Sequence, residues 1–107
     1  MKKETVRLLT INGWKEVKGF VVAPGLAVTP SVVRAGGSNP AGWWNVTHLP
    51  SGKAIGGPRP FWVAWRLAKG LMTLGDWTIK ARRPADFKAI DPEKVRVLIR
   101  ASRELDA

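Results

Sequence analysis

The sequence predicts an α+β fold: an antiparallel sheet of four to five short strands packed by one helix, followed by a second, C-terminal helix. Three observations predict it. Short segments of alternating hydrophobicity, separated by turn residues, fill the first half of the chain. An apolar pattern with helical spacing follows, and the chain closes with an amphipathic segment that begins with proline. The chain has 107 residues, the size of one domain. We expect residues 1–77 to form the sheet and helix core, and residues 78–107 to add a basic linker and the last helix to the same domain.

The first three strands are predicted by alternation and by two turn signals. Thr5–Ile11 alternates in hydrophobicity, and Asn12-Gly13 is a strong signal for a two-residue hairpin turn. A second strand, Lys15–Val22, follows that turn. A proline-glycine turn then leads into a short third strand, Leu26–Thr29, with residues 32 and 33 as a candidate continuation.

Two more strands are expected beyond a glycine-rich surface loop at Ala35–Gly42. They are Trp43–Leu49 and Lys53–Gly56, joined by a tight turn at residues 50–52. Gly57–Pro60 is expected to break the sheet and to lead into the first helix, because proline suits a first helical turn.

Each predicted helix has its own start and stop signals. The first, Phe61–Leu74, ends before Gly75. Its apolar stripe consists of Phe61, Ala64, Trp65, Ala68, Leu71 and Met72. The second begins with Asp91 as N-cap and a proline in its first turn, and runs to about Leu105. This helix either docks on the first or projects and pairs with a second copy, so a homodimer is one expectation.

The charge of the chain points to polyanionic partners. Eighteen Lys and Arg against eight Asp and Glu give a formal charge of +10, and no acidic residue occurs between Val17 and Gly75. A field of this sign favours nucleic acid first, DNA ahead of RNA, and acidic protein surfaces second. The chain also has no Gln, three Asn and eight Pro, which is typical of thermostable proteins and of biased genomes alike.

Absent residue types exclude several kinds of function. The chain has no Cys, and hence no disulfide framework, thiolate chemistry or Cys-based zinc site. His48 is the one histidine and is predicted to be a hydrogen-bonded residue beside a turn, so we expect no metal, no cofactor and no enzymatic activity. No stretch of about 20 apolar residues occurs, and residues 1–5 do not lead into an apolar signal core, so we expect a cytoplasmic protein without membrane contacts.

One face of the first helix is a candidate nucleic-acid site. At 100° per residue, Trp62, Arg66, Lys69 and Thr73 fall within about 60° of one another, away from the apolar stripe. An exposed indole there can stack on a base while the two cations hold phosphates. The alternative is structural: Trp62 packs against a loop, the linker or the second helix.

The second helix has a similar row of cations. Arg96, Arg100 and Arg103 are spaced i, i+4 and i+7, which suits a phosphate backbone. The alternative is a solvated helix face that Glu93 and Glu104 partly neutralise.

The fourth predicted strand contains two adjacent Trp residues that must point to opposite faces of the sheet. If Trp44 belongs to the core, Trp43 can form an aromatic and polar platform with Lys53 and its polar neighbours. If the sheet is covered on both sides, both indoles are structural. The remaining candidate phosphate ligands are Arg59, Lys80, Arg82 and Arg83.

Together these features predict a non-catalytic nucleic-acid-binding protein that prefers single strands. Trp is a stacking residue, whereas the chain has no recognisable helix for reading base edges. The order of elements over Trp43–Leu74 is similar in outline to integrase arm-binding domains, and the whole layout resembles transcription-coactivator single-strand binders; no signature residue matches, so no site is transferred. The alternative is a small basic adaptor or inhibitor, of phage or other viral origin, that covers an acidic surface of a larger protein machine.

Overall fold

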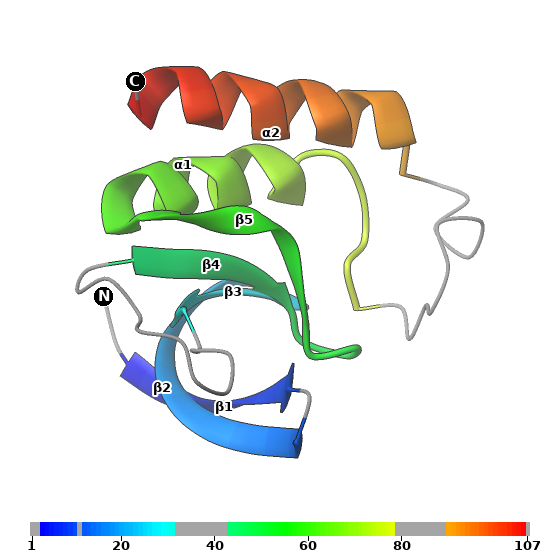
Figure 1. Ribbon diagram of the computed structural model, residues 1–107. Coiled ribbons are helices and arrows are strands. Elements are labelled where there is room, and N and C mark those ends of the chain that lie inside the picture. The colour runs from blue at the N-terminus through cyan, green and yellow to red at the C-terminus, as the bar shows by residue number, and fades with distance from the viewer. Residues whose placement is uncertain (1–2, 11, 32–42, 79–89, 107) are drawn as a thin grey trace.

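The computed structural model describes residues 3–10, 12–31, 43–78 and 90–106, with side chains as far as residue 102. It confirms the α+β class, because five antiparallel strands are followed by two helices (Figure 1). The elements are β1 (Lys3–Thr10), β2 (Gly13–Ala23), β3 (Leu26–Pro30), β4 (Trp43–His48), β5 (Lys53–Pro60), α1 (Phe61–Met72) and α2 (Pro92–Asp106). The predicted loop at 35–42, its neighbours 32 and 33, and residues 79–89 of the basic linker lie outside the described residues.

The five strands form one meander in the order β1-β2-β3-β4-β5, each antiparallel to the next. The predicted β1–β2 hairpin forms, but its turn lies one residue earlier than expected: Gly13 is already the first residue of β2 and pairs with Thr10, with a φ of 101° that favours glycine. The β1–β2 ribbon curls strongly (Figure 1), and the Leu9 N–H donates to the Gly52 carbonyl at 2.9 Å. The end of β1 therefore touches the β4–β5 turn, and the sheet is a partly closed barrel.

The central part of the sheet is buried on both faces, whereas much of the β1–β2 hairpin is exposed. On the outer face, the register aligns Val28, Val46 and Ile55 across β3, β4 and β5, where they pack with the buried side of α1. On the inner face, Val6 and Leu8 of β1 are buried, as their alternation predicts. The other buried residues of that face are Ala27, Thr29 and Thr47.

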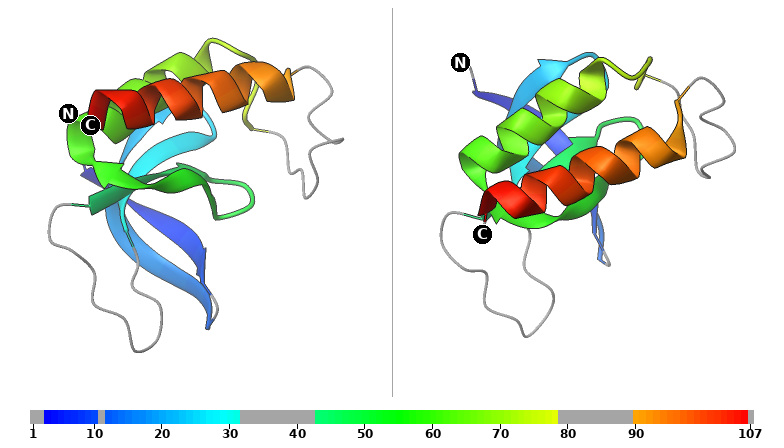
Figure 2. Two further views of the ribbon diagram at one scale, coloured as in Figure 1. Left: turned by 45° about the horizontal axis from the view of Figure 1, so that its top comes forward. Right: turned by 90° about the horizontal axis from the view of Figure 1, so that it is seen from above.

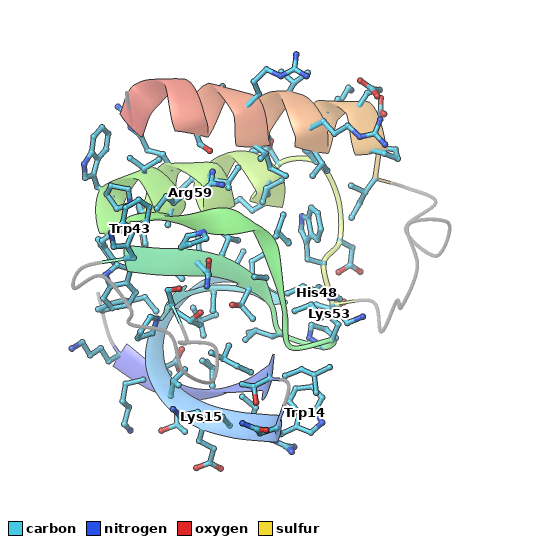
Figure 3. The ribbon with its side chains drawn as sticks, in the orientation of Figure 1. Trp14, Lys15, Trp43, His48, Lys53 and Arg59 are labelled. Atoms are coloured by element: carbon cyan, nitrogen blue, oxygen red, sulfur yellow. The ribbon has the colours of Figure 1, made fainter. Side chains whose placement is uncertain are left out.

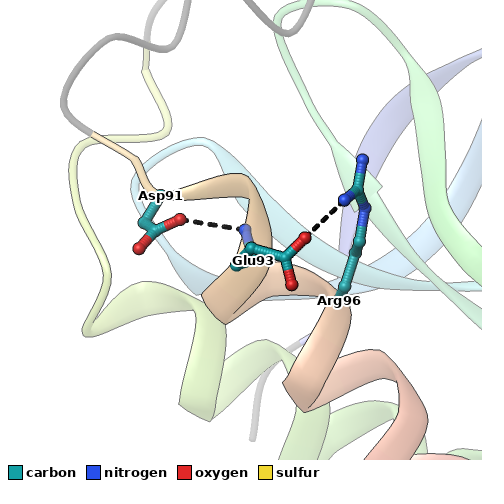
Figure 4. A network of polar contacts seen from close by, with 3 residues as sticks. All are labelled: Asp91, Glu93 and Arg96. Atoms are coloured by element: carbon teal, nitrogen blue, oxygen red, sulfur yellow. Dashed lines mark hydrogen bonds and ion pairs between the residues drawn. The ribbon is translucent and has the colours of Figure 1, made fainter.

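The two helices lie side by side over the outer face (Figure 2). Gly70 of α1 marks their closest approach, because a Cβ added there would lie 3.2 Å from two side-chain atoms of Leu98. The predicted N-cap of α2 is confirmed: Asp91 Oδ1 accepts the Glu93 N–H at 2.9 Å (Figure 4). Of the two expected arrangements, α2 docks on α1 rather than projecting.

Two expectations about the helix boundary need correction. Gly57–Pro60 does not break the sheet, since β5 continues to Pro60. β5 is the edge strand of the sheet, where a proline whose nitrogen faces away from β4 removes no hydrogen bond between strands. The pairing of β5 with β4 is irregular near Gly56, which has a φ of 75°. Met72 ends α1 and is exposed, so it does not belong to the buried stripe. Within the described part of the chain, neither helix has the length and apolar character needed to cross a membrane.

Candidate nucleic-acid interface

The exposed face of α1 presents one exposed indole and two cations, with the half-buried indole of Trp65 at its margin. One side of the helix is buried against the rest of the protein, and its buried residues are Val63, Ala64, Leu67, Ala68 and Leu71. The opposite side contains Trp62, which is 51% exposed, and also Arg66 and Lys69. About half of the Trp62 surface is therefore open to solvent, whereas the loop and most of the linker named in the structural alternative lie outside the described residues.

Each cation on this face lies over an aromatic ring. The Arg66 Cζ is 5.4 Å from the ring centroid of Trp62, and the Lys69 Nζ is 5.8 Å from that of Trp65. Such contacts contribute about 0.5–1 kcal/mol each at exposed sites. No described carboxylate forms an ion pair with Arg66 or Lys69. The two charges are held in place by rings and keep their capacity to bind an anion.

An aromatic cluster supports this face from behind. The Trp65 ring stacks on Phe61 with centroids 6.2 Å apart, and Phe61 meets Trp44 edge to face at 5.0 Å. Phe20 of β2 closes the cluster, 5.3 Å from Phe61, and the Lys3 Nζ lies 5.8 Å from its centroid. Trp44 is thus the core member of the Trp43-Trp44 pair.

The platform predicted around Trp43 does not form. Its neighbours on the inner face are enclosed: Thr47 is buried and hydrogen-bonded to Thr29 at 2.8 Å, and the Asn45 Oδ1 is shielded from solvent. Lys53 is exposed, but it pairs with His48 and therefore lies on the outer face of the sheet, opposite to Trp43. Figure 3 shows Trp43 and Lys53 at opposite ends of the sheet. The sheet is closed on both sides, which is the structural alternative.

Arg59 is removed from the candidate surface, because its side chain is only 3% exposed. Its Nε donates to the Gly57 carbonyl at 2.9 Å, and its Nη1 donates to the Ser102 hydroxyl of α2. Ser102 in turn donates to the Ile99 carbonyl at 2.7 Å. This arginine ties α2 to β5 and has no free face for a phosphate.

The arginines of α2 lie away from the α1 face. Leu98 contacts α1, whereas Ile99 lies near Gly56 of β5. At 100° per residue, Arg96 and Arg100 are both about 160° from Leu98 around the helix. Both are exposed, and Arg96 is ion-paired with Glu93 at 2.5 Å (Figure 4). The side chain of Arg103 and the residues Lys80, Arg82 and Arg83 lie outside the described part of the structure.

His48 has the structural role that its position predicts. It is buried, with Nδ1 2.8 Å from the Ser51 hydroxyl and Nε2 2.9 Å from the Trp77 carbonyl. A carbonyl only accepts hydrogen bonds, so Nε2 bears a proton. His48 therefore joins the β4–β5 turn to the segment after α1. Among the described residues, no three His, Cys, Asp or Glu side chains are grouped so that they could hold a metal ion.

One exposed aromatic residue was missed by the sequence analysis. Trp14 is 47% exposed, and the Arg7 Cζ lies 4.9 Å from its ring centroid. The alternation that buries Val6 and Leu8 predicts that Arg7 lies on the opposite, exposed face of β1. That Trp14 lies on this same face follows only from the pairing of β1 with β2.

The comparisons with known proteins offer no functional guide. No protein-family model, no curated protein sequence and no solved structure matches this chain.

Proposed function

We propose that this protein is a non-catalytic nucleic-acid-binding protein that holds single strands on the exposed face of α1. The observation that carries the proposal is the exposed indole of Trp62 beside two cations on α1: Arg66 lies over Trp62 itself, and Lys69 lies over the half-buried Trp65. DNA is the first ligand to test, in a protein that we expect to be cytoplasmic.

Each part of this face suits a component of a single strand. Bases stack on indoles and also on guanidinium planes, and each stacked base is worth roughly 1–3 kcal/mol. Phosphates are held by Arg and Lys without regard to sequence. The formal charge of +10 attracts the strand over a longer range. In a duplex the bases are already stacked on each other, so the indoles favour a strand with free bases.

The test is a titration of intrinsic Trp fluorescence with single-stranded and duplex DNA of the same sequence, at low and moderate salt. We expect quenching by the single strand. Trp62→Ala should weaken binding by about five-fold or more, the equivalent of one lost stacking contact, whereas Trp62→Phe should retain most of the affinity.

Val97→Ala is the matched control, because Val97 is an exposed apolar residue on the other helix. It should leave binding unchanged. If the wild-type protein binds neither DNA at low salt, the proposal is wrong. Exposed Trp and Arg are also common anchors in protein interfaces, so an acidic protein partner would then be the next candidate.

A further inference from the structure

The outer face of the β1–β2 hairpin presents a second row of cations and aromatic rings. The strand register places alternate residues of β1 and β2 opposite each other on this face. The pairs, from one end to the other, are Lys3 with Phe20, Thr5 with Lys18, Arg7 with Glu16, and Leu9 with Trp14. All but Phe20, which is half-buried, are exposed, and Glu16 is the one carboxylate among them.

The far end of this row is held rigidly. A Cβ added to Gly52, which has a φ of 70°, would lie 2.4 Å from Cζ3 of Trp14, so the indole rests directly on the β4–β5 turn. On the hairpin itself, the guanidinium of Arg7 lies over the same indole, and the Lys18 Nζ donates to the Thr5 hydroxyl at 2.7 Å. Trp14 is exposed and fixed, so binding a base there costs little conformational entropy.

The near end of the row joins the face of α1. Phe20 pairs with Val28, and Val28 belongs to the core under the helix, so the hairpin row and α1 lie on the same side of the sheet. Phe20 lies 5.3 Å from Phe61, which stacks with Trp65 of the proposed site. The rings and cations therefore continue from α1 onto the hairpin without a change of face.

We propose that the single strand bound on α1 continues along the outer face of the β1–β2 hairpin to a second stacking position at Trp14. This inference rests on the proposed function. Trp14 and Phe20 are six residues apart on one strand, a distance of about 20 Å at roughly 3.3 Å per residue. Lys3, Arg7 and Lys18 line this path and match the charge of the phosphates.

The proposal predicts that the contribution of the hairpin depends on the length of the strand. Sites on small sheet proteins accommodate roughly 4–16 nucleotides, so we compare oligonucleotides of about 4 and about 12 nucleotides by fluorescence titration. Wild-type protein should bind the longer one more tightly. The double variant Arg7→Gln/Lys18→Gln should lose most of that gain, about five-fold or more, and should bind the shorter one as the wild type does.

Lys15→Gln is the matched control. Lys15 is on the same strand as Lys18 and is also exposed, but it pairs with the buried Leu8 and therefore lies on the face opposite to Trp14. It should retain the gain with length. Trp14→Ala, checked for folding by its thermal midpoint, should behave as the double variant does.

The outcomes separate this inference from the proposed function. If the double variant keeps the full gain with length, the strand leaves the protein at α1 and the inference is wrong, although the proposed function stands. If the variant weakens both lengths equally, the hairpin is not a continuation, and the inference is wrong again. If wild-type protein binds neither length, the proposed function itself fails.

Discussion

Single residues of the same type have different roles in this protein, and their surroundings decide which. Trp77 is 5% exposed, and its Nε1 donates to the Leu71 carbonyl at 2.7 Å, so it is a structural residue. Trp44 belongs to the aromatic cluster at the edge of the core. Trp14 and Trp62 are about half exposed, and each has an arginine over its ring. These two are the residues that we assign to binding.

Asp76 provides a test of the local structure in the segment that follows α1. Hydrogen bonds from the hydroxyl of Thr78 at 2.6 Å and from its backbone N–H at 2.9 Å lower the pKa of this carboxyl. Since the folded pKa is depressed, the contribution to stability is present at neutral pH and is lost as the pH falls through the folded pKa.

An NMR titration of the Asp76 carboxyl should therefore give a pKa below the ordinary range. Thr78→Val removes the hydroxyl donor and retains the backbone donor, so it should shift that pKa part of the way back. An identical Asp76 pKa in both proteins would show that the hydrogen bond from the Thr78 hydroxyl does not stabilise the ionised carboxylate.

At the scale of elements, α2 is attached to the core by apolar packing and by a buried polar contact to Arg59. Leu98 packs at Gly70 of α1, and the guanidinium of Arg59 bonds to Ser102. The edge strand β5 is thereby covered by a helix, which protects it from pairing with another chain. Arg59, which the sequence suggested as a phosphate ligand, is therefore a structural residue.

Arg59→Leu should lower the free energy of unfolding by about 2–3 kcal/mol. The substitution removes the hydrogen bonds that the guanidinium donates to the Gly57 carbonyl and to the Ser102 hydroxyl. Urea unfolding gives the free energy of unfolding. Arg96→Gln is the matched control: its ion pair with Glu93 is exposed and should contribute less than about 1 kcal/mol. Equal losses in the two variants would contradict the structural role of Arg59.

At the scale of the whole molecule, the cations are distributed over several surfaces and only some adjoin exposed indoles. Arg7 and Arg66 lie over the exposed indoles of Trp14 and Trp62, whereas Arg96 and Arg100 lie on the far side of α2 from α1. Net charge attracts a strand to the whole molecule, but only cations that touch its phosphates release counterions.

The dependence of affinity on salt should distinguish these surfaces. For single strands each phosphate contact contributes roughly 0.7 to the slope of log K against log salt. Arg66→Gln should reduce that slope by the contribution of about one phosphate contact. Arg100→Gln removes the same charge from the other helix and should leave the slope unaltered. A loss of slope in Arg100→Gln instead would place the strand on α2.

Much of the fold could be predicted from the sequence because its signals are local. The hairpin signal at Asn12-Gly13, the alternation around Val6 and Leu8, and the Asp91 N-cap each depend on neighbouring residues. The alternation and the N-cap are confirmed, and the hairpin forms with its turn shifted by one residue, because Gly13 pairs with Thr10. The angular position of Trp62 on its helix was equally local, and the indole is exposed as that position suggested.

Only the tertiary structure decided which of the remaining candidates face solvent. Arg59 and Thr47 are buried because α2 and the curled sheet, both distant in sequence, close over them. Trp14 joins the row on the hairpin because a two-strand register puts it beside Arg7 and because Gly52 supports its ring. Periodicity specifies the side of an element on which a residue lies; what covers that side depends on contacts between segments far apart in the chain.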